Sequence, residues 1–140
     1  MKITLDRIND DYLFEAKGKA GVPVYIDNTS KEGAKGASPM ELLLMGVGAC
    51  SAIDVIAILK KQRQVIDGYH VEVEGGRKEV KEAKPFESMH VKIFLEGDIN
   101  PIKAKKAAEL SFDKYCSVSI TMENCVSVSH EILINGQSVA

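Results

Sequence analysis

The fold is decided by residues 38–59, which read SPMELLLMGVGACSAIDVIAIL. Ser38 is a good helix N-cap, and Pro39 suits the first helical position. Glu41 stands where a capping box needs a carboxylate that reaches back to the Ser38 amide. The pattern therefore predicts a helix that runs to about Lys61–Gln62, where positive charge suits the C-terminal end of the helix dipole. Because this helix is apolar on nearly every side, most of its surface must be covered.

The segments outside this helix alternate between strand and helix patterns. We expect two or three antiparallel strands within residues 1–27, strands at 69–74 and 89–96, a helix from Asn100-Pro101 to about Lys114, and a strand at 125–134. The second helix should place Ile102, Ala107, Leu110 and Phe112 among its core contacts. This order predicts one α+β domain over residues 1–140, with an antiparallel sheet, a long buried central helix and a second helix.

The first helix carries more apolar surface than one two-layer domain can cover. A patch of small residues lies along it, at which another backbone could approach closely: Gly46, Gly48, Ala49, Ser51 and Ala52. The simplest way to cover the remaining surface is a second copy of the chain. The sequence therefore predicts a homodimer.

Composition and charge narrow the classes of function. The chain has 140 residues, of which 45% are apolar and 27% charged, with a net charge of −2. These values are typical of a globular protein and do not favour nucleic acid or an anionic membrane as partner. The N-terminus lacks the apolar segment of a signal peptide, and Asp54 interrupts the longest apolar run. We therefore expect a cytoplasmic protein with reduced cysteines and no membrane span.

Two cysteines stand in distinctive contexts. Cys50 lies eleven residues after Pro39, at the end of the run Gly48-Ala49-Cys50, and the second follows the second helix in Tyr115-Cys116-Ser117-Val118-Ser119. With the motif SPMELL at residues 38–43 and the order of elements, these features resemble the OsmC/Ohr superfamily of thiol-dependent organic hydroperoxide reductases and their stress-induced relatives. The continuation AIDV at residues 52–55 looks closest to the YhfA-like OsmC branch.

The resemblance implies an intertwined homodimer with its active site at the subunit interface. It assigns Cys50 as the peroxidatic thiol and Cys116 as the resolving thiol of a peroxiredoxin-like peroxidase for organic or lipid hydroperoxides. The cysteines would form a disulfide, which a small dithiol or a lipoylated protein would reduce. No metal or organic cofactor is implied. The alternative is a non-catalytic OsmC-like dimer that binds an apolar small molecule or senses redox state.

Other candidate residues have simpler interpretations. Cys125 matches no position of the family pattern, so we expect inert packing. His70, His90 and His130 have no metal-ligand spacing. The catalytic glutamate of the hydroperoxide reductases lies ten residues before their cysteine, where this chain has a methionine, so we interpret Glu41 as a helix cap.

The group that activates the Cys50 thiolate is not evident. The hydroperoxide reductases use an arginine from the N-terminal region, whereas residues 9–37 contain no arginine and four lysines, Lys17, Lys19, Lys31 and Lys35. A lysine supplies charge without the bidentate geometry of a guanidinium group. Asp54, one helical turn after Cys50, adds a like charge on the same face unless a cation neutralises it.

Overall fold

The long helix forms where the sequence predicts it. In the computed structural model, which describes residues 1–139, α1 spans Pro39–Lys61. The Ser38 amide donates to Glu41 Oε2 at 2.7 Å, and the Glu41 amide donates to Ser38 Oγ at 3.1 Å. The hydrogen bond from the Ser38 backbone lowers the pKa of Glu41. The capping box, and with it the interpretation of Glu41 as a helix cap, is confirmed.

The chain divides into two compact units, Met1–Leu43 and Leu44–Ala140. The first contains a three-stranded antiparallel sheet of β1 (Thr4–Arg7), β2 (Phe14–Lys17) and β3 (Val24–Ile26), in that order. Three antiparallel strands agree with the prediction for residues 1–27. A single domain over residues 1–140 stays a prediction.

The second unit is built on a four-stranded sheet in the order β4 (Gly68–Arg77), β5 (Phe86–Glu96), β6 (Ser127–Ile134) and β7 (Gln137–Ser138). The β4–β5 and β6–β7 pairs are antiparallel as predicted, but β5 and β6 are parallel. Parallel pairing follows because the helical segment between β5 and β6 returns the chain to the end at which β5 began. The last long strand also begins two residues later than predicted, which leaves Cys125 before the sheet.

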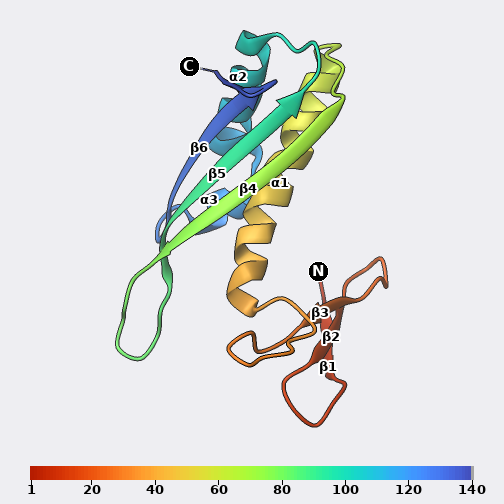
Figure 1. The fold of residues 1–140 in the computed structure, drawn as a ribbon, viewed down its shortest axis with the longest axis vertical. Coiled ribbons are helices and arrows are strands. Elements are labelled where there is room, and N and C mark those ends of the chain that lie inside the picture. The colour runs from red at the N-terminus through yellow and green to blue at the C-terminus, as the bar shows by residue number, and fades with distance from the viewer. Residues whose placement is uncertain (140) are drawn as a thin grey trace. The chain divides into compact units, whose positions relative to one another are not determined.

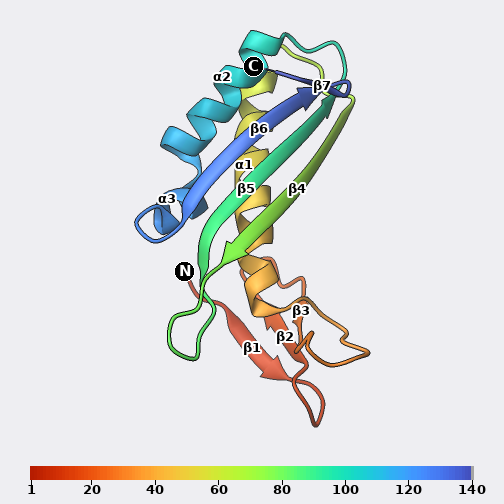
Figure 2. The same ribbon diagram turned by 60° about the vertical axis from the view of Figure 1, so that its left-hand side comes forward.

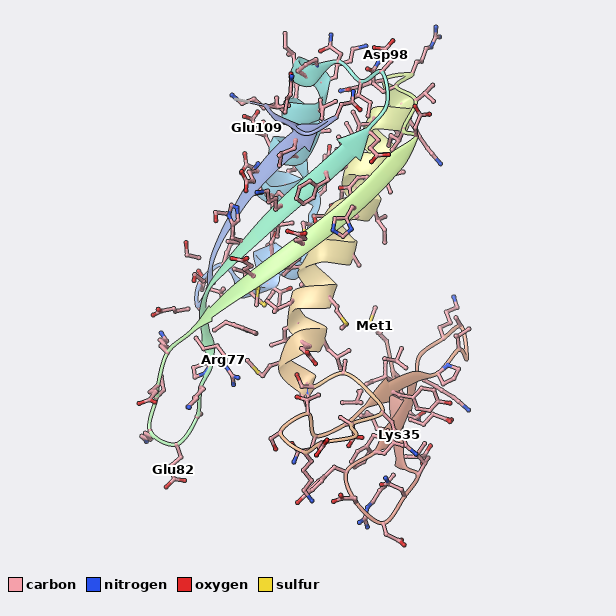
Figure 3. All side chains as sticks on the ribbon, in the orientation of Figure 1. Met1, Lys35, Arg77, Glu82, Asp98 and Glu109 are labelled. Atoms are coloured by element: carbon pink, nitrogen blue, oxygen red, sulfur yellow. The ribbon has the colours of Figure 1, made fainter. Side chains whose placement is uncertain are left out.

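The loop between β4 and β5 carries charged residues. Glu82 lies near its tip and Arg77 ends β4 (Figure 3). Arg77 Nε donates to the Lys84 carbonyl at 2.6 Å, across the base of the loop. This bond holds the two ends of the hairpin loop together.

Helical segments connect β5 to β6. The first is α2 (Pro101–Leu110), which begins at Asn100, whose side chain accepts from the amides of Ile102 and Lys103. A π-helical turn, η1 (Ser111–Tyr115), follows, and then the short helix α3 (Ser117–Met122). The predicted helix limits are therefore close, but Ile102 is 78% exposed and does not contact the core as predicted, because it lies in the first turn on the outer side of α2.

The core of the second unit lies between one face of its sheet and the helices. Both α1 and α2 lie on the same face of the sheet (Figures 1 and 2). Alternate residues of β5 point to this face and are buried, and α1 contributes a stripe at helical spacing. The buried apolar residues include Val47, Val55, Leu59, Met89, Val91, Ile93, Leu95, Ala104, Ala107, Ala108, Ile132 and Ile134.

The small residue at position 48 of α1 is required by close packing against β4. A Cβ built at this position would lie 2.9 Å from Val73 Cγ2 of β4, which is closer than real Cβ atoms approach. Gly48 and Ser51 are both buried within the chain. These two residues therefore serve packing within the chain and not, as predicted, the approach of a second backbone.

Most of the remaining surface of α1 is not buried within one chain. Its buried residues form one stripe, Val47, Gly48, Ser51, Val55 and Leu59, while Ile53 on another side is 68% exposed. By length and composition alone α1 could cross a membrane, but a core helix passes the same test, so this is weak evidence.

Candidate active site

The structure brings the two predicted cysteines together. The Sγ atoms of Cys50 and Cys116 and a carboxylate oxygen of Asp54 all lie within 4.8 Å of one another. All three residues belong to the second unit. Cys116 is buried, whereas Cys50 and Asp54 are partly exposed. Both thiols are free.

The helix α1 supplies two members of this cluster. Cys50 and Asp54 are four residues apart, so their side chains lie one above the other on the same helix face. The placement of Asp54 on the face of Cys50 agrees with the prediction from the sequence. Within the described part of the second unit, no lysine, arginine or histidine nitrogen lies within 4.0 Å of the Asp54 carboxylate.

The π-helical turn η1 supplies the other side of the site. Its wider turn closes with a hydrogen bond of 2.7 Å from the Cys116 amide to the Ser111 carbonyl. Ser111 is fully buried, and its Oγ donates to Asp54 Oδ2 at 3.0 Å. This hydrogen bond joins η1 to α1 next to the two thiols. Ser111 was missed in the sequence, where a serine late in an amphipathic helix carries no distinct signal.

Cys116 occupies the N-cap position of α3 but makes no side-chain cap hydrogen bond there. Its backbone is extended, with φ −69° and ψ 95°, and the Ser119 hydroxyl donates to its carbonyl at 3.1 Å. Burial raises the pKa of the Cys116 thiol, hydrogen bonds with Ser119 oppose this, and the neighbouring Cys50 raises the pKa further. Cys116 is therefore held as a neutral thiol at neutral pH.

The third cysteine is not packed as predicted. Cys125 is exposed, in the turn between α3 and β6. The prediction failed because it placed Cys125 in the strand, whereas β6 begins at Ser127. Cys125 is not part of the cluster of Cys50, Asp54 and Cys116.

The histidines are dispersed on the sheet. His70 Nε2 lies 3.4 Å from Glu72, and His90 lies between Ser129 and Glu131. His130 stacks on Phe112 with ring centroids 4.4 Å apart, and burial lowers its pKa. Among the described residues, the one set of three Cys, His, Asp or Glu side chains close enough to share a metal ion is Cys50, Asp54 and Cys116.

The lysines of the first unit differ in their partners. Lys17 pairs with Glu15 at 2.9 Å, and Lys31 pairs with Asp11 at 3.3 Å. Neither Lys19 nor Lys35 has a carboxylate within 4.0 Å among the described residues. Of Lys17, Lys19, Lys31 and Lys35, therefore, Lys19 and Lys35 are the two that form no ion pair with a carboxylate of the described residues.

Comparison with known proteins identifies the family. The model of the OsmC-like protein family matches residues 31–131, which include Cys50, Asp54, Ser111 and Cys116. The chain therefore belongs to the OsmC-like family.

Individual relatives agree with this assignment. The chain is similar to protein YhfA of Escherichia coli K12, with 35% identity over 84% of this chain and 86% of YhfA. The fold is similar to the crystal structure of a hypothetical protein from Aquifex aeolicus VF5, with a TM-score of 0.80, 30% identity and 96% of both chains covered. It is also similar to the organic hydroperoxide resistance protein OhrB of Bacillus subtilis, with a TM-score of 0.64, 20% identity, and 94% and 96% of the two chains covered. The last comparison shows the fold alone.

Burial and pKa predict different reactivities for Cys116 and Cys125. In the reduced native protein we expect iodoacetamide to alkylate Cys125 at least about tenfold faster than Cys116, since thiolates are the reactive form. A raised pKa leaves Cys116 with less thiolate at neutral pH, so its rate should keep rising as pH passes the ordinary thiol pKa of about 8.5. Mass spectrometry of timed digests measures both rates. Denatured protein, in which the rates should converge, is the control, and equal rates in native protein would contradict the structure.

Proposed function

We propose that this protein is a thiol-dependent peroxidase that reduces organic hydroperoxides with Cys50 and Cys116. The observation that carries the proposal is the approach of the two thiols to within 4.8 Å, although they are far apart in the chain. Their unequal burial supports unequal roles. Cys50 is partly exposed and is open to a substrate, whereas Cys116 is buried and is suited to act only on a product formed beside it.

In the first step the Cys50 thiolate attacks one oxygen of the hydroperoxide. A sulfur–oxygen bond forms, the oxygen–oxygen bond breaks, and the alkoxide leaves and takes up a proton to become an alcohol. The sulfur is oxidised by two electrons to a sulfenic acid, and the peroxide is reduced by the same two electrons.

In the second step Cys116 attacks the sulfenic sulfur of Cys50. A disulfide bond forms, the sulfur–oxygen bond breaks, and the hydroxyl group leaves as water with the proton of the Cys116 thiol. An external dithiol, small or protein-bound as in lipoylated proteins, then reduces the disulfide by exchange and is itself oxidised to a disulfide. This step requires a reducing compartment, and we infer a cytoplasmic location.

Asp54 and Ser111 are positioning residues in this scheme. The Ser111 hydrogen bond holds the Asp54 carboxylate beside both sulfurs.

A non-catalytic binding protein is the less favoured alternative. A protein that only binds an apolar molecule has no requirement for two free thiols and a carboxylate at one point.

We further propose that the protein works as a homodimer. The exposed side of α1, including Ile53 at 68% exposure, is apolar surface that a second copy would cover. Cys50 on the same helix is partly exposed, so the second copy would help to enclose the site.

Replacing the proposed nucleophile should abolish turnover. We expect Cys50→Ser to reduce the rate of cumene hydroperoxide consumption with a dithiol reductant to the uncatalysed level, because a hydroxyl group does not replace a thiolate as nucleophile. Cys125→Ala is the matched control and should keep nearly full activity. Retained turnover in folded Cys50→Ser protein, checked by circular dichroism, would rule out the assignment.

Oxidation should join the two clustered cysteines. One equivalent of hydroperoxide should produce a Cys50–Cys116 disulfide, found by mass spectrometry of unreduced digests. Because the pKa of Cys116 is raised, we expect the rate of disulfide formation to increase with pH up to and beyond the ordinary thiol pKa of about 8.5. In Cys116→Ser, a dimedone adduct should appear on Cys50. A dominant Cys50–Cys125 bond would instead give the resolving role to Cys125.

A charge on the exposed side of α1 should weaken dimerisation. Light scattering of the wild-type chain should give twice the monomer mass of 15.3 kDa, and Ile53→Glu should shift the protein toward monomer, because a buried unpaired charge is costly. Ile102→Glu, at an isoleucine 78% exposed on α2, is the control and should remain dimeric. A wild-type protein that is monomeric at micromolar concentration would overturn the proposal.

A further inference from the structure

The cluster of Cys50, Asp54 and Cys116 has the composition and spacing of a site for a soft divalent metal ion. Thiolate sulfur and carboxylate oxygen are both ligands of Zn²⁺, with zinc–sulfur distances of about 2.3 Å and zinc–oxygen distances of about 2.0–2.2 Å. Two sulfurs on one tetrahedral zinc are then about 3.8 Å apart. Ligand atoms that already lie within 4.8 Å of one another need to move inward by only about 1 Å.

The helix geometry suits such a site. Cys50 and Asp54 are four residues apart on α1, the spacing at which two helix side chains reach one zinc ion in known metal motifs. Cys116 approaches from the junction of η1 and α3, a different element. Ligands from two elements, one of which supplies a pair at helical spacing, surround an ion from more than one side.

A supporting residue is already in place behind the ligands. Metal-binding carboxylates are usually oriented by a hydrogen bond to the oxygen that does not ligate. Here Ser111 Oγ donates to Asp54 Oδ2 at 3.0 Å, from a fully buried position, which leaves Oδ1 for another partner. This hydrogen bond comes from a residue outside the three ligands and fits the outer shell of a metal site.

The charge balance also favours a cation. With both thiols ionised, the cluster would carry three negative charges, and no cationic nitrogen of the described part of the second unit lies within 4.0 Å of Asp54. A divalent ion would reduce this to one negative charge. Metal binding also ionises coordinating thiols, since the ion displaces their protons.

We propose that the reduced protein binds Zn²⁺, or a similar thiophilic divalent ion, through Cys50, Asp54 and Cys116. Three protein ligands leave a fourth position for water. Hard ions such as Mg²⁺ and Ca²⁺ are excluded, because two of the three ligands are thiolates. Binding releases the thiol protons and occupies both sulfurs, so the metal-bound protein cannot form the disulfide and the disulfide form cannot bind the metal.

In this way the ion protects the thiols from oxidation. That consequence for turnover rests on the proposed peroxidase function, whereas the metal site itself does not. Zinc would inhibit peroxide consumption reversibly, and a chelator would restore it.

The experiment titrates the reduced full-length chain with Co²⁺ as a spectroscopic probe and then displaces it with Zn²⁺. We expect one equivalent of Co²⁺ to give a thiolate-to-cobalt charge-transfer band and the visible bands of four-coordinate cobalt, and Zn²⁺ to remove them. Cys50→Ser and Cys116→Ser should each lose the charge-transfer intensity of one sulfur and bind at least about tenfold more weakly. Protein oxidised beforehand to the disulfide should give no band.

The remaining variants test the carboxylate and its support. Asp54→Asn keeps the size of the side chain, and Ser111→Ala removes only the supporting hydrogen bond; both should weaken Co²⁺ binding by about tenfold or more. Cys125→Ser is the matched cysteine control and should bind as the wild type does. Circular dichroism of each variant confirms that it is folded.

Specific results would overturn the metal site. These are the absence of a cobalt band in reduced wild-type protein, loss of the band in Cys125→Ser, or wild-type affinity in Asp54→Asn. Peroxide turnover is measured on the same metal-free samples. Metal binding without peroxide turnover would contradict the proposed peroxidase function and support the metal site. Turnover without metal binding would support the peroxidase function and contradict the metal site.

Discussion

A helix that is apolar on every side can bury only one stripe against a single sheet, and this constraint governs the structure. The stripe of α1 with Val47, Ser51, Val55 and Leu59 packs within its own chain. Cys50 and Asp54 lie beside that stripe, not in it, and are therefore only partly covered. The site exists at the border between the packed and the unpacked surface of one helix. Residues deeper in the stripe would be inaccessible, and residues farther round would not meet η1.

Local sequence patterns were sufficient to predict where most of the helices and strands lie. The capping box at Ser38 and Glu41, the alternation in β5 and the start of a helix at Asn100-Pro101 each depend on residues a few positions apart, and each was predicted correctly. The resemblance to the OsmC/Ohr superfamily was also confirmed by the family match over residues 31–131. The predictions that were wrong concern contacts between residues that are distant in the chain. The parallel pairing of β5 with β6 and the packing of Gly48 on β4 have no local signal.

Part of the candidate site was also predictable from local sequence patterns. The motifs identified Cys50 and Cys116, and helix periodicity placed Asp54 on the face of Cys50. The π-helical turn was not predicted, because it differs from a regular helix end by one additional residue in a hydrogen-bonded ring and its sequence, SFDKY, has no proline or glycine to mark it. Without this turn, neither the role of Ser111 nor the burial of Cys116 could be anticipated. The histidines have no metal-ligand spacing in the sequence, and no local pattern connects two distant thiols with a carboxylate.

The placement of Cys116 in the connection between β5 and β6 has a consequence for biosynthesis. The two clustered thiols can meet only after β4, β5, α2 and the π-helical turn, which separate them in the chain, have been made. Until then, a nascent chain carries Cys50 on an unpaired apolar helix, without its partner. Before the chain is folded, Cys50, Cys116 and Cys125 are three accessible thiols, so an oxidant can join the wrong pair. The reducing power of the compartment therefore matters first for the maturation of this protein and only afterwards for any chemistry that it performs.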